Sequence, residues 1–192
     1  KVLTSGEGGI ITTNDKALAD KMRRIRAIGL DRSINNYESF EVGSNYKMSE
    51  ITAILAQLHT NQAEDLISER QRIAERYNNG LNFNKKIKRF NLPPNTTSCY
   101  YKYYLYVDTI KTRDYLRKYC QSLYIDLPPF TYERLCSEQD ISKKMNCQVP
   151  EKLVNSEYLT KHIVCLPMYN NLKLSEVDHI IHTVNDFLLI NQ

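Results

Sequence analysis

The chain opens with a lysine followed by a glycine-rich turn, and this combination constrains its fold more than any other feature. The first nine residues read Lys1-Val-Leu-Thr-Ser-Gly-Glu-Gly-Gly9, and the run Ile10-Ile11-Thr12-Thr13 follows. Glycine permits positive φ angles and close backbone approach, and a short β-branched run predicts a buried strand. We therefore expect Lys1 on a tight loop beside a sheet, where a lysine can attack a carbonyl as a neutral amine.

Two other interpretations of this stretch have to be weighed. A lysine near a glycine-rich turn is most often a solvated surface residue, and the residues alone leave that interpretation open. A phosphate-binding P-loop ends in Gly-Lys-Ser/Thr. Here Lys1 precedes the glycines, so we discard the P-loop.

Composition is that of an ordinary globular protein. The chain has 192 residues, 42% of them hydrophobic and 25% charged, which suffices for one domain or a domain and a half. The net charge is +4, and the densest basic cluster, Lys85–Arg89, is short; it fits a solvated loop better than a nucleic-acid surface. No apolar run approaches the roughly 18 residues of a membrane span, and no signal peptide is apparent.

Cysteine and histidine spacings argue against disulfides and metal sites. The five cysteines, an odd number, form no C-x-x-C pair, so we expect free thiols in a reducing cytoplasm. His179 and His182 are three residues apart and could share a helix face. We expect the edge of an amphipathic helix there and predict no metal site.

Periodicity predicts three helices in the first 80 residues. Asn14 or Asp15 is expected to cap a helix that Gly29 closes as its C′ residue. Ser49 is expected to cap the next helix, whose apolar stripe consists of Ile51, Ile54, Leu55 and Leu58. A long helical stretch follows and ends near Gly80.

The second half alternates strands and helices. A Pro-, Asn- and Thr-rich boundary at residues 91–98 precedes an aromatic strand, Tyr100–Val107. Tyrosine-rich strands can stack nucleic-acid bases, but we see no matching basic-aromatic second strand and expect no nucleic-acid partner. The remaining elements are expected to be a helix from Thr112 or Arg113, a strand at 123–127, a helix plus loop at 137–148, a helical stretch at 154–159, a buried strand at 163–167 and a helix capped by Ser175. This βαβ-like order fits a small α/β domain.

Several motifs together resemble the DegT/DnrJ/StrS family of pyridoxal-phosphate (PLP) sugar aminotransferases. They are Lys1–Gly9, Thr12–Asp15 with the helix to Gly29, Gly43–Glu50, the helix through Arg70, Ala74 and Tyr77, and Leu166–Tyr169. The resemblance implies an α/β fold of type I PLP-transferases. It divides the chain into the end of the large domain (1–48), connecting helices (49–90) and a small C-terminal α/β domain (91–192).

The resemblance also implies roles for two residues. Lys1 matches the family lysine that forms the Schiff base with PLP and moves the proton during transamination. Asn45 matches an asparagine that reaches across a homodimer interface to the PLP phosphate of the neighbouring subunit; from the residues alone it would be an ordinary turn asparagine. The chain departs from the family at Lys47, where arginine is usual, and at Phe130–Cys136, which lacks the histidines of relatives.

The implied reaction moves an amino group from an amino acid such as glutamate to a keto sugar on a nucleotide. In the family, the acidic partner of the pyridine nitrogen and most phosphate donors lie upstream of the lysine. We therefore expect the 192-residue chain to be inactive without an upstream half. The alternatives are a PLP-dependent dehydratase and a non-catalytic fragment or interaction module derived from such an enzyme.

Overall fold

A computed structural model describes residues 1–31, 33–34, 38–128, 134–148 and 152–191. The chain divides into two compact units, Lys1–Glu64 and Asp65–Gln192. Most of the segment Phe130–Cys136, where the sequence departs from its relatives, lies outside the described residues.

The first helix of unit 1, α1 (Lys16–Arg26), begins as the sequence predicts. The Asp15 side chain accepts a hydrogen bond of 3.0 Å from the backbone N–H of Leu18. Its end differs by one residue from the prediction. Ile28 has a φ of 60° and takes the left-handed C′ position, while the next N–H, that of Gly29, donates to the Arg24 carbonyl.

Gly29 is nevertheless required where it stands. Its φ is 82°, and a Cβ there would lie 2.0 Å from the carbonyl oxygen of Glu41. Gly43 makes a similar close approach, because its Cβ would lie 2.4 Å from the Ile25 carbonyl oxygen. The backbone after α1 and the segment around residues 41–43 therefore pack too closely for any side chain.

The second helix of unit 1, α2 (Glu50–Asn61), confirms Ser49 as its N-cap, with the side chain accepting from the Thr52 N–H. The predicted apolar stripe is present but lies on the surface of the unit. Its members are 42–76% exposed: Ile51, Ile54, Leu55 and Leu58. Among the described residues of unit 1, only Ala27 and Gly29 are buried.

The prediction of a strand at Ile10–Thr13 is wrong. The segment forms neither helix nor strand, and Ile10 and Ile11 are 69% and 75% exposed. A strand needs a neighbour to accept and donate its backbone hydrogen bonds. The described part of unit 1 offers only the isolated bridges Ala27–Asn45 and Leu30–Ser39.

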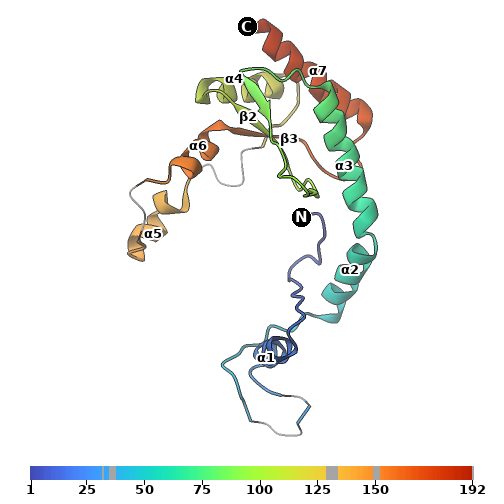
Figure 1. The fold of residues 1–192 in the computed structure, drawn as a ribbon, viewed down its shortest axis with the longest axis vertical. Helices are drawn as coiled ribbons and strands as arrows, with labels where there is room; N and C mark the ends of the chain where they lie inside the picture. Colours follow the sequence, from blue (N-terminus) through green and yellow to red (C-terminus); the bar gives the residue numbers. More distant parts are fainter. Residues whose placement is uncertain (32, 35–37, 129–133, 149–151, 192) are drawn as a thin grey trace. The chain divides into compact units, whose positions relative to one another are not determined.

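Unit 2 is built on a three-stranded antiparallel sheet of order β1-β2-β3 (Figure 1). The strands are β1 (Ile87–Arg89), β2 (Tyr103–Val107) and β3 (Ile163–Leu166). Lys88 pairs with Tyr106, and Tyr104 pairs with Cys165. Both neighbours of β2 run antiparallel to it. The basic cluster, expected to be a loop, supplies β1. The expected βαβ-like order is wrong, because the strand that would complete it after the helix from Thr112 or Arg113 does not form.

The strand predicted at 123–127 is also absent. Leu123 caps the preceding helix, and Tyr124 has a φ of 61° and is fully exposed. Ile125 and Leu127 are buried in the core, which explains their apolar character, but the segment pairs with no strand among the described residues.

Five α-helices and a 3₁₀ turn accompany the sheet among the described residues of unit 2. They are α3 (Ala63–Gly80, from Asp65 on), α4 (Ile110–Ser122), η1 (Cys136–Glu138), α5 (Asp140–Lys144), α6 (Val154–His162) and α7 (Leu174–Ile190). Two predicted caps are displaced. Thr109 caps α4, because its hydroxyl accepts from the Thr112 N–H. Lys173 precedes α7, and its backbone N–H donates to the Glu176 carboxylate at 2.9 Å.

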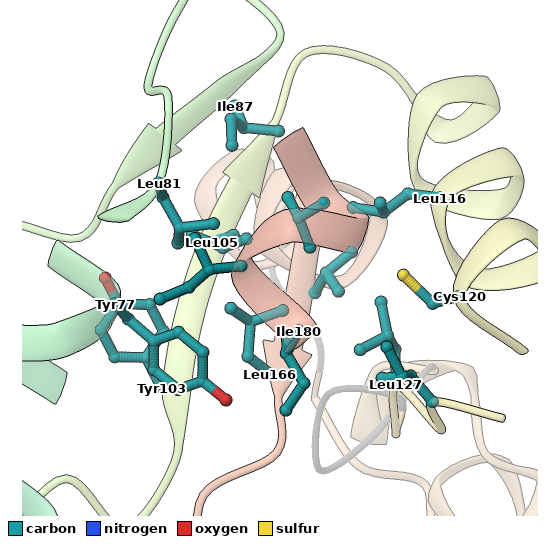
Figure 2. Packing of buried hydrophobic residues seen from close by; sticks show 14 of the residues in the cluster. Tyr77, Leu81, Ile87, Tyr103, Leu105, Leu116, Cys120, Leu127, Leu166 and Ile180 are labelled. Carbon is teal, nitrogen blue, oxygen red and sulfur yellow. The ribbon is translucent and has the colours of Figure 1, made fainter. Parts of the chain in front are cut away.

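The hydrophobic core lies between one face of the sheet and helices α3, α4 and α7. Figure 2 shows the rings of Tyr77 and Tyr103 close together, with Leu116 and Cys120 of α4 across the cluster; the two ring centroids are 4.8 Å apart. The apolar face predicted for the last helix is confirmed as core. Its buried members are Val177, Ile180, Ile181, Val184, Phe187 and Leu188.

Candidate active site

The glycine-rich loop at Lys1–Gly9 is shaped by short local hydrogen bonds. The Ser5 hydroxyl donates to the Glu7 carbonyl at 2.9 Å, and the Gly6 N–H donates to the Thr4 hydroxyl at 3.1 Å. Gly6 and Gly8 have φ angles of 84° and 127°, which explains the glycines. Lys1 is exposed and is not held beside a strand, contrary to expectation, because the strand does not form.

This loop lies against the second sequence motif. A Cβ on Gly8 would come within 2.8 Å of the Met48 methyl carbon. The two motifs are 40 residues apart in sequence, so only the fold of unit 1 brings them together. Lys1 and Asn45 therefore belong to two segments that contact each other at Gly8 and Met48.

Asn45 is positioned by backbone hydrogen bonds to the end of α1. The Ser44 N–H donates to the Ile25 carbonyl and the Tyr46 N–H to the Arg26 carbonyl, each at 3.1 Å. Asn45 itself bridges to Ala27. Because its neighbours dock on α1, the exposed Asn45 side chain is presented from a fixed backbone.

An ion pair closes the intervening loop onto the same helix. Arg24 contacts Glu41 at 3.1 Å and Asp31 at 3.8 Å, and all three side chains are about one quarter exposed. Hydrogen bonds from Ser33, and secondarily the Arg24 charge, lower the pKa of Asp31. The loop that leads to Asn45 is thus tied to α1 by charge as well as by backbone.

Unit 2 contains a pocket of about 720 Å³ at the start of α7 and the end of β3, within the size range of small-molecule sites. Leu166 and Ile180 form part of its apolar lining. Its polar and aromatic lining includes Lys102, Asp126, Glu176, His179, Tyr101, Tyr124 and Tyr169.

One buried arginine of α3 holds a wall of this pocket. Arg70 is 7% exposed, and its guanidinium donates to the carbonyls of Tyr100, Tyr101 and Met168 at 3.2–3.4 Å. Its Nε donates to the Asn170 side chain at 2.7 Å. Tyr101 and Met168 line the pocket, so Arg70 fixes two pocket segments that are far apart in sequence.

Glu69, which precedes Arg70 in α3, holds the same Asn170–Asn171 turn. Its carboxylate accepts from the Asn170 amide at 2.9 Å and from the Asn171 N–H at 2.8 Å. These hydrogen bonds lower the pKa of Glu69. The sequence did not predict this role of Arg70, although its spacing to Ile73, Ala74 and Tyr77 placed it on the buried face of the helix.

A scan against protein-family models matches residues 1–185 to the DegT/DnrJ/EryC1/StrS aminotransferase family. The chain belongs to this family. It is 27% identical over 187 residues to GDP-perosamine synthase of Escherichia coli O157:H7. The aligned region covers 97% of this chain and 49% of that relative. It is 38% identical over 81 residues to GDP-perosamine synthase of Caulobacter vibrioides, covering 42% of the chain and 22% of the relative.

Solved structures of DegT/DnrJ/EryC1/StrS aminotransferases share the fold. An aminotransferase of this family from Brucella abortus matches with a TM-score of 0.78 at 28% identity, over 91% of this chain and 44% of its own. The aminotransferase TlmJ from Streptoalloteichus hindustanus matches with a TM-score of 0.83 at 23% identity. The match covers 100% of this chain and 50% of TlmJ. The type I PLP-transferase fold is therefore confirmed, and the chain spans about half the length of the family members that it matches throughout.

Two further findings concern the described residues alone. None of their helices is both long and apolar enough to cross a bilayer. Their His, Cys, Asp and Glu side chains form no group of three that could hold a metal ion, and His179 and His182 are exposed on α7.

Proposed function

We propose that the protein to which this chain belongs transfers an amino group from glutamate to a keto sugar carried on a nucleotide, with PLP as cofactor. The observation that carries the proposal is the family match over residues 1–185. The names of relatives supply the substrate class: one is a UDP-4-amino-4-deoxy-L-arabinose–oxoglutarate aminotransferase from Shewanella sediminis, 24% identical over 98% of the chain and 52% of its own length. Oxoglutarate is glutamate after loss of its amino group.

The side chains of unit 1 suit a PLP site in part. An exposed lysine and an exposed amide lie on two segments that touch at Gly8 and Met48. An amide N–H₂ is a donor suited to a phosphate oxygen. Lys1 would hold the cofactor, and Asn45 would donate across a homodimer interface to the PLP phosphate of the neighbouring subunit.

When bound, PLP supplies an electron sink for the carbanion that transamination requires. Nζ of Lys1 would move a proton from the donor Cα to C4′ of the cofactor in the first half of the reaction, and from C4′ to the acceptor carbon of the sugar in the second half.

We propose that this activity needs the portion of the family fold that the chain does not span. The chain spans about half of its relatives, and a PLP enzyme also needs an acidic group on the pyridine nitrogen. The free cysteines suit a cytoplasmic enzyme. The pocket in unit 2 offers aromatic rings and carboxylates suited to a sugar, without indicating which one.

A non-catalytic interaction module is the second candidate, and one observation favours it. The described part of unit 1 has almost no core, and the apolar stripe of α2 is exposed. Such a unit is expected to be stable only when another polypeptide surface covers it.

The test is to incubate the protein with PLP, reduce it with borohydride and map the adduct by mass spectrometry. We expect one reduced adduct at Nζ of Lys1, in the complete protein but not in the isolated 192-residue chain. Peptide fragmentation has to separate Nζ from any α-amine at the same residue. Lys1→Arg should abolish the adduct and Lys16→Arg, an exposed control, should not. A complete protein without an adduct at Lys1 would favour the module.

A further inference from the structure

The outer face of the sheet, away from the core, combines the basic cluster with the tyrosine-rich strand. Lys88 of β1 and Tyr106 of β2 are directly paired in the antiparallel register, so their side chains share a face. Phe90 follows on the same face, with its ring centroid 5.9 Å from that of Tyr106 and 6.3 Å from that of Tyr104. The sequence alone showed no basic-aromatic strand to match β2, but in the structure β1 and the residues that follow it form one.

Helix α6 adds a second aromatic wall. Tyr158 is 48% exposed, and it stacks on His162 with ring centroids 4.1 Å apart and planes 9° apart. Burial raises the pKa of Tyr106, and the nearby Tyr158 phenol adds to the shift. The two tyrosines are therefore close, although one comes from the sheet and the other from α6.

A pocket of about 520 Å³ lies between these walls, separate from the larger pocket of unit 2. The pocket is lined by five residues that differ in chemistry: Lys88, Tyr106, Asn155, Tyr158 and Leu159. The pocket is shallow and open to solvent, and its volume suits one small molecule.

The lining matches three parts of one ligand class. Aromatic rings stack on the flat faces of nucleobases. An asparagine amide can pair with the exocyclic amine and ring nitrogen of adenine. A lysine ammonium supplies the charge that a phosphate requires, and a neutral sugar would leave that charge unused. We propose that this pocket, here called the outer-face pocket, binds an adenine nucleotide.

This inference does not depend on the aminotransferase proposal. The outer-face pocket lies wholly within unit 2 and contains neither Lys1 nor Asn45. A nucleotide could therefore bind in the outer-face pocket whether or not PLP is bound at Lys1. Its test therefore needs no PLP and no amino donor.

The experiment is isothermal titration calorimetry of the protein with ADP in the absence of PLP. We expect saturable binding with a Kd below about 1 mM. Adenosine and inorganic phosphate, titrated separately, should each bind more weakly than ADP, because each fills only part of the pocket. A failure here would leave the Lys1 adduct unaffected, so the two proposals fail separately.

Matched variants locate the site. Tyr158→Ala should weaken ADP binding by about fivefold or more, since base stacking on an aromatic side chain contributes about 1–3 kcal/mol. Tyr115→Ala is its control, because Tyr115 is 49% exposed and lies outside the pocket. Lys88→Ala should weaken binding about tenfold, whereas Lys85→Ala, just before β1, should change it little.

Four results would overturn the proposal. They are no saturable ADP binding up to about 1 mM, binding that Tyr158→Ala and Lys88→Ala leave unchanged, glucose binding as tightly as ADP, and a single-stranded oligonucleotide binding far more tightly than ADP. The third would assign the pocket to carbohydrate and the fourth to nucleic acid. Circular dichroism of each variant confirms that the fold is retained.

Discussion

Arg70 and Asn170 are 100 residues apart in sequence, yet the Arg70 Nε donates a hydrogen bond of 2.7 Å to the Asn170 side-chain oxygen. The Asn170 amide in turn donates to the Leu66 carbonyl and to Glu69. The first residues of α3 in unit 2 are thereby linked to the turn between β3 and α7. This link fixes one wall of the larger pocket before any ligand is present.

Removing the Arg70 guanidinium should destabilise unit 2 strongly. Arg70→Met leaves three backbone carbonyls and the Asn170 oxygen without their donor, and an unsatisfied buried polar group costs about 1–3 kcal/mol. We expect a loss of at least about 2 kcal/mol by urea denaturation. Arg70→Lys should recover only part of it, because lysine lacks the planar fork.

Arg76→Met is the matched control on the same helix. Arg76 forms a bidentate pair with Asp178, but the two side chains are 52% and 34% exposed. Exposed ion pairs contribute about 0–1 kcal/mol. Equal losses for the Arg70 and Arg76 variants would contradict the role assigned to Arg70.

Gly80 should be coupled energetically to Ile181. A Cβ on Gly80 would lie 2.8 Å from the Ile181 Cδ1 and 3.0 Å from its Cγ2, so Gly80→Ala forces a helix contact apart. Ile181→Val removes Cδ1. In a double-mutant cycle by urea denaturation, we expect Gly80→Ala to destabilise less in the Ile181→Val background, with an interaction energy of about 0.5 kcal/mol or more. Additive effects would show that α3 and α7 adjust freely at this point.

Three of the five cysteines should react with a thiol reagent in the native protein. Cys99, Cys136 and Cys147 are exposed, whereas Cys120 and Cys165 are buried. Burial raises the pKa of Cys120 to about 12 and that of Cys165 to about 11, so neither forms the reactive thiolate near pH 8. Spectrophotometric titration with a disulfide reagent should give three thiols before and five after addition of guanidinium chloride. A fourth fast-reacting thiol would mean that the core opens readily.

Glu69 should make stability fall in acid. Hydrogen bonds from the Asn170 amide and the Asn171 N–H lower its pKa below the ordinary value of 4.5. A carboxylate with a lowered folded-state pKa stabilises the fold above its unfolded-state pKa, and this contribution is lost as pH falls through the folded-state value. Melting temperatures measured from pH 7 down to about 3 should therefore fall less for Glu69→Gln than for the wild type. Glu75→Gln, exposed on the same helix, should follow the wild type.

Local sequence determined most of the helices and the first two N-caps. Asp15 and Ser49 cap α1 and α2 because a side-chain oxygen three residues before an N–H satisfies it without help from the rest of the chain. The apolar spacing of α7 predicted its buried face for the same reason, because the helical period depends only on residues within that one segment. The motif around Lys1 and the motif at Gly43–Glu50 together indicated the family, which the match over residues 1–185 confirms.

Tertiary structure decided everything that depends on a distant partner. Ile10–Thr13 has strand-forming residues but no described strand to pair with, and Lys88, expected in a loop, pairs with Tyr106 because β2 offers it hydrogen bonds. The same holds for the burial of Arg70, whose acceptors come from two segments about 30 and 100 residues away. A sequence pattern reports the preferences of a segment, whereas a backbone or charged group is satisfied only by whatever the fold places within hydrogen-bonding distance.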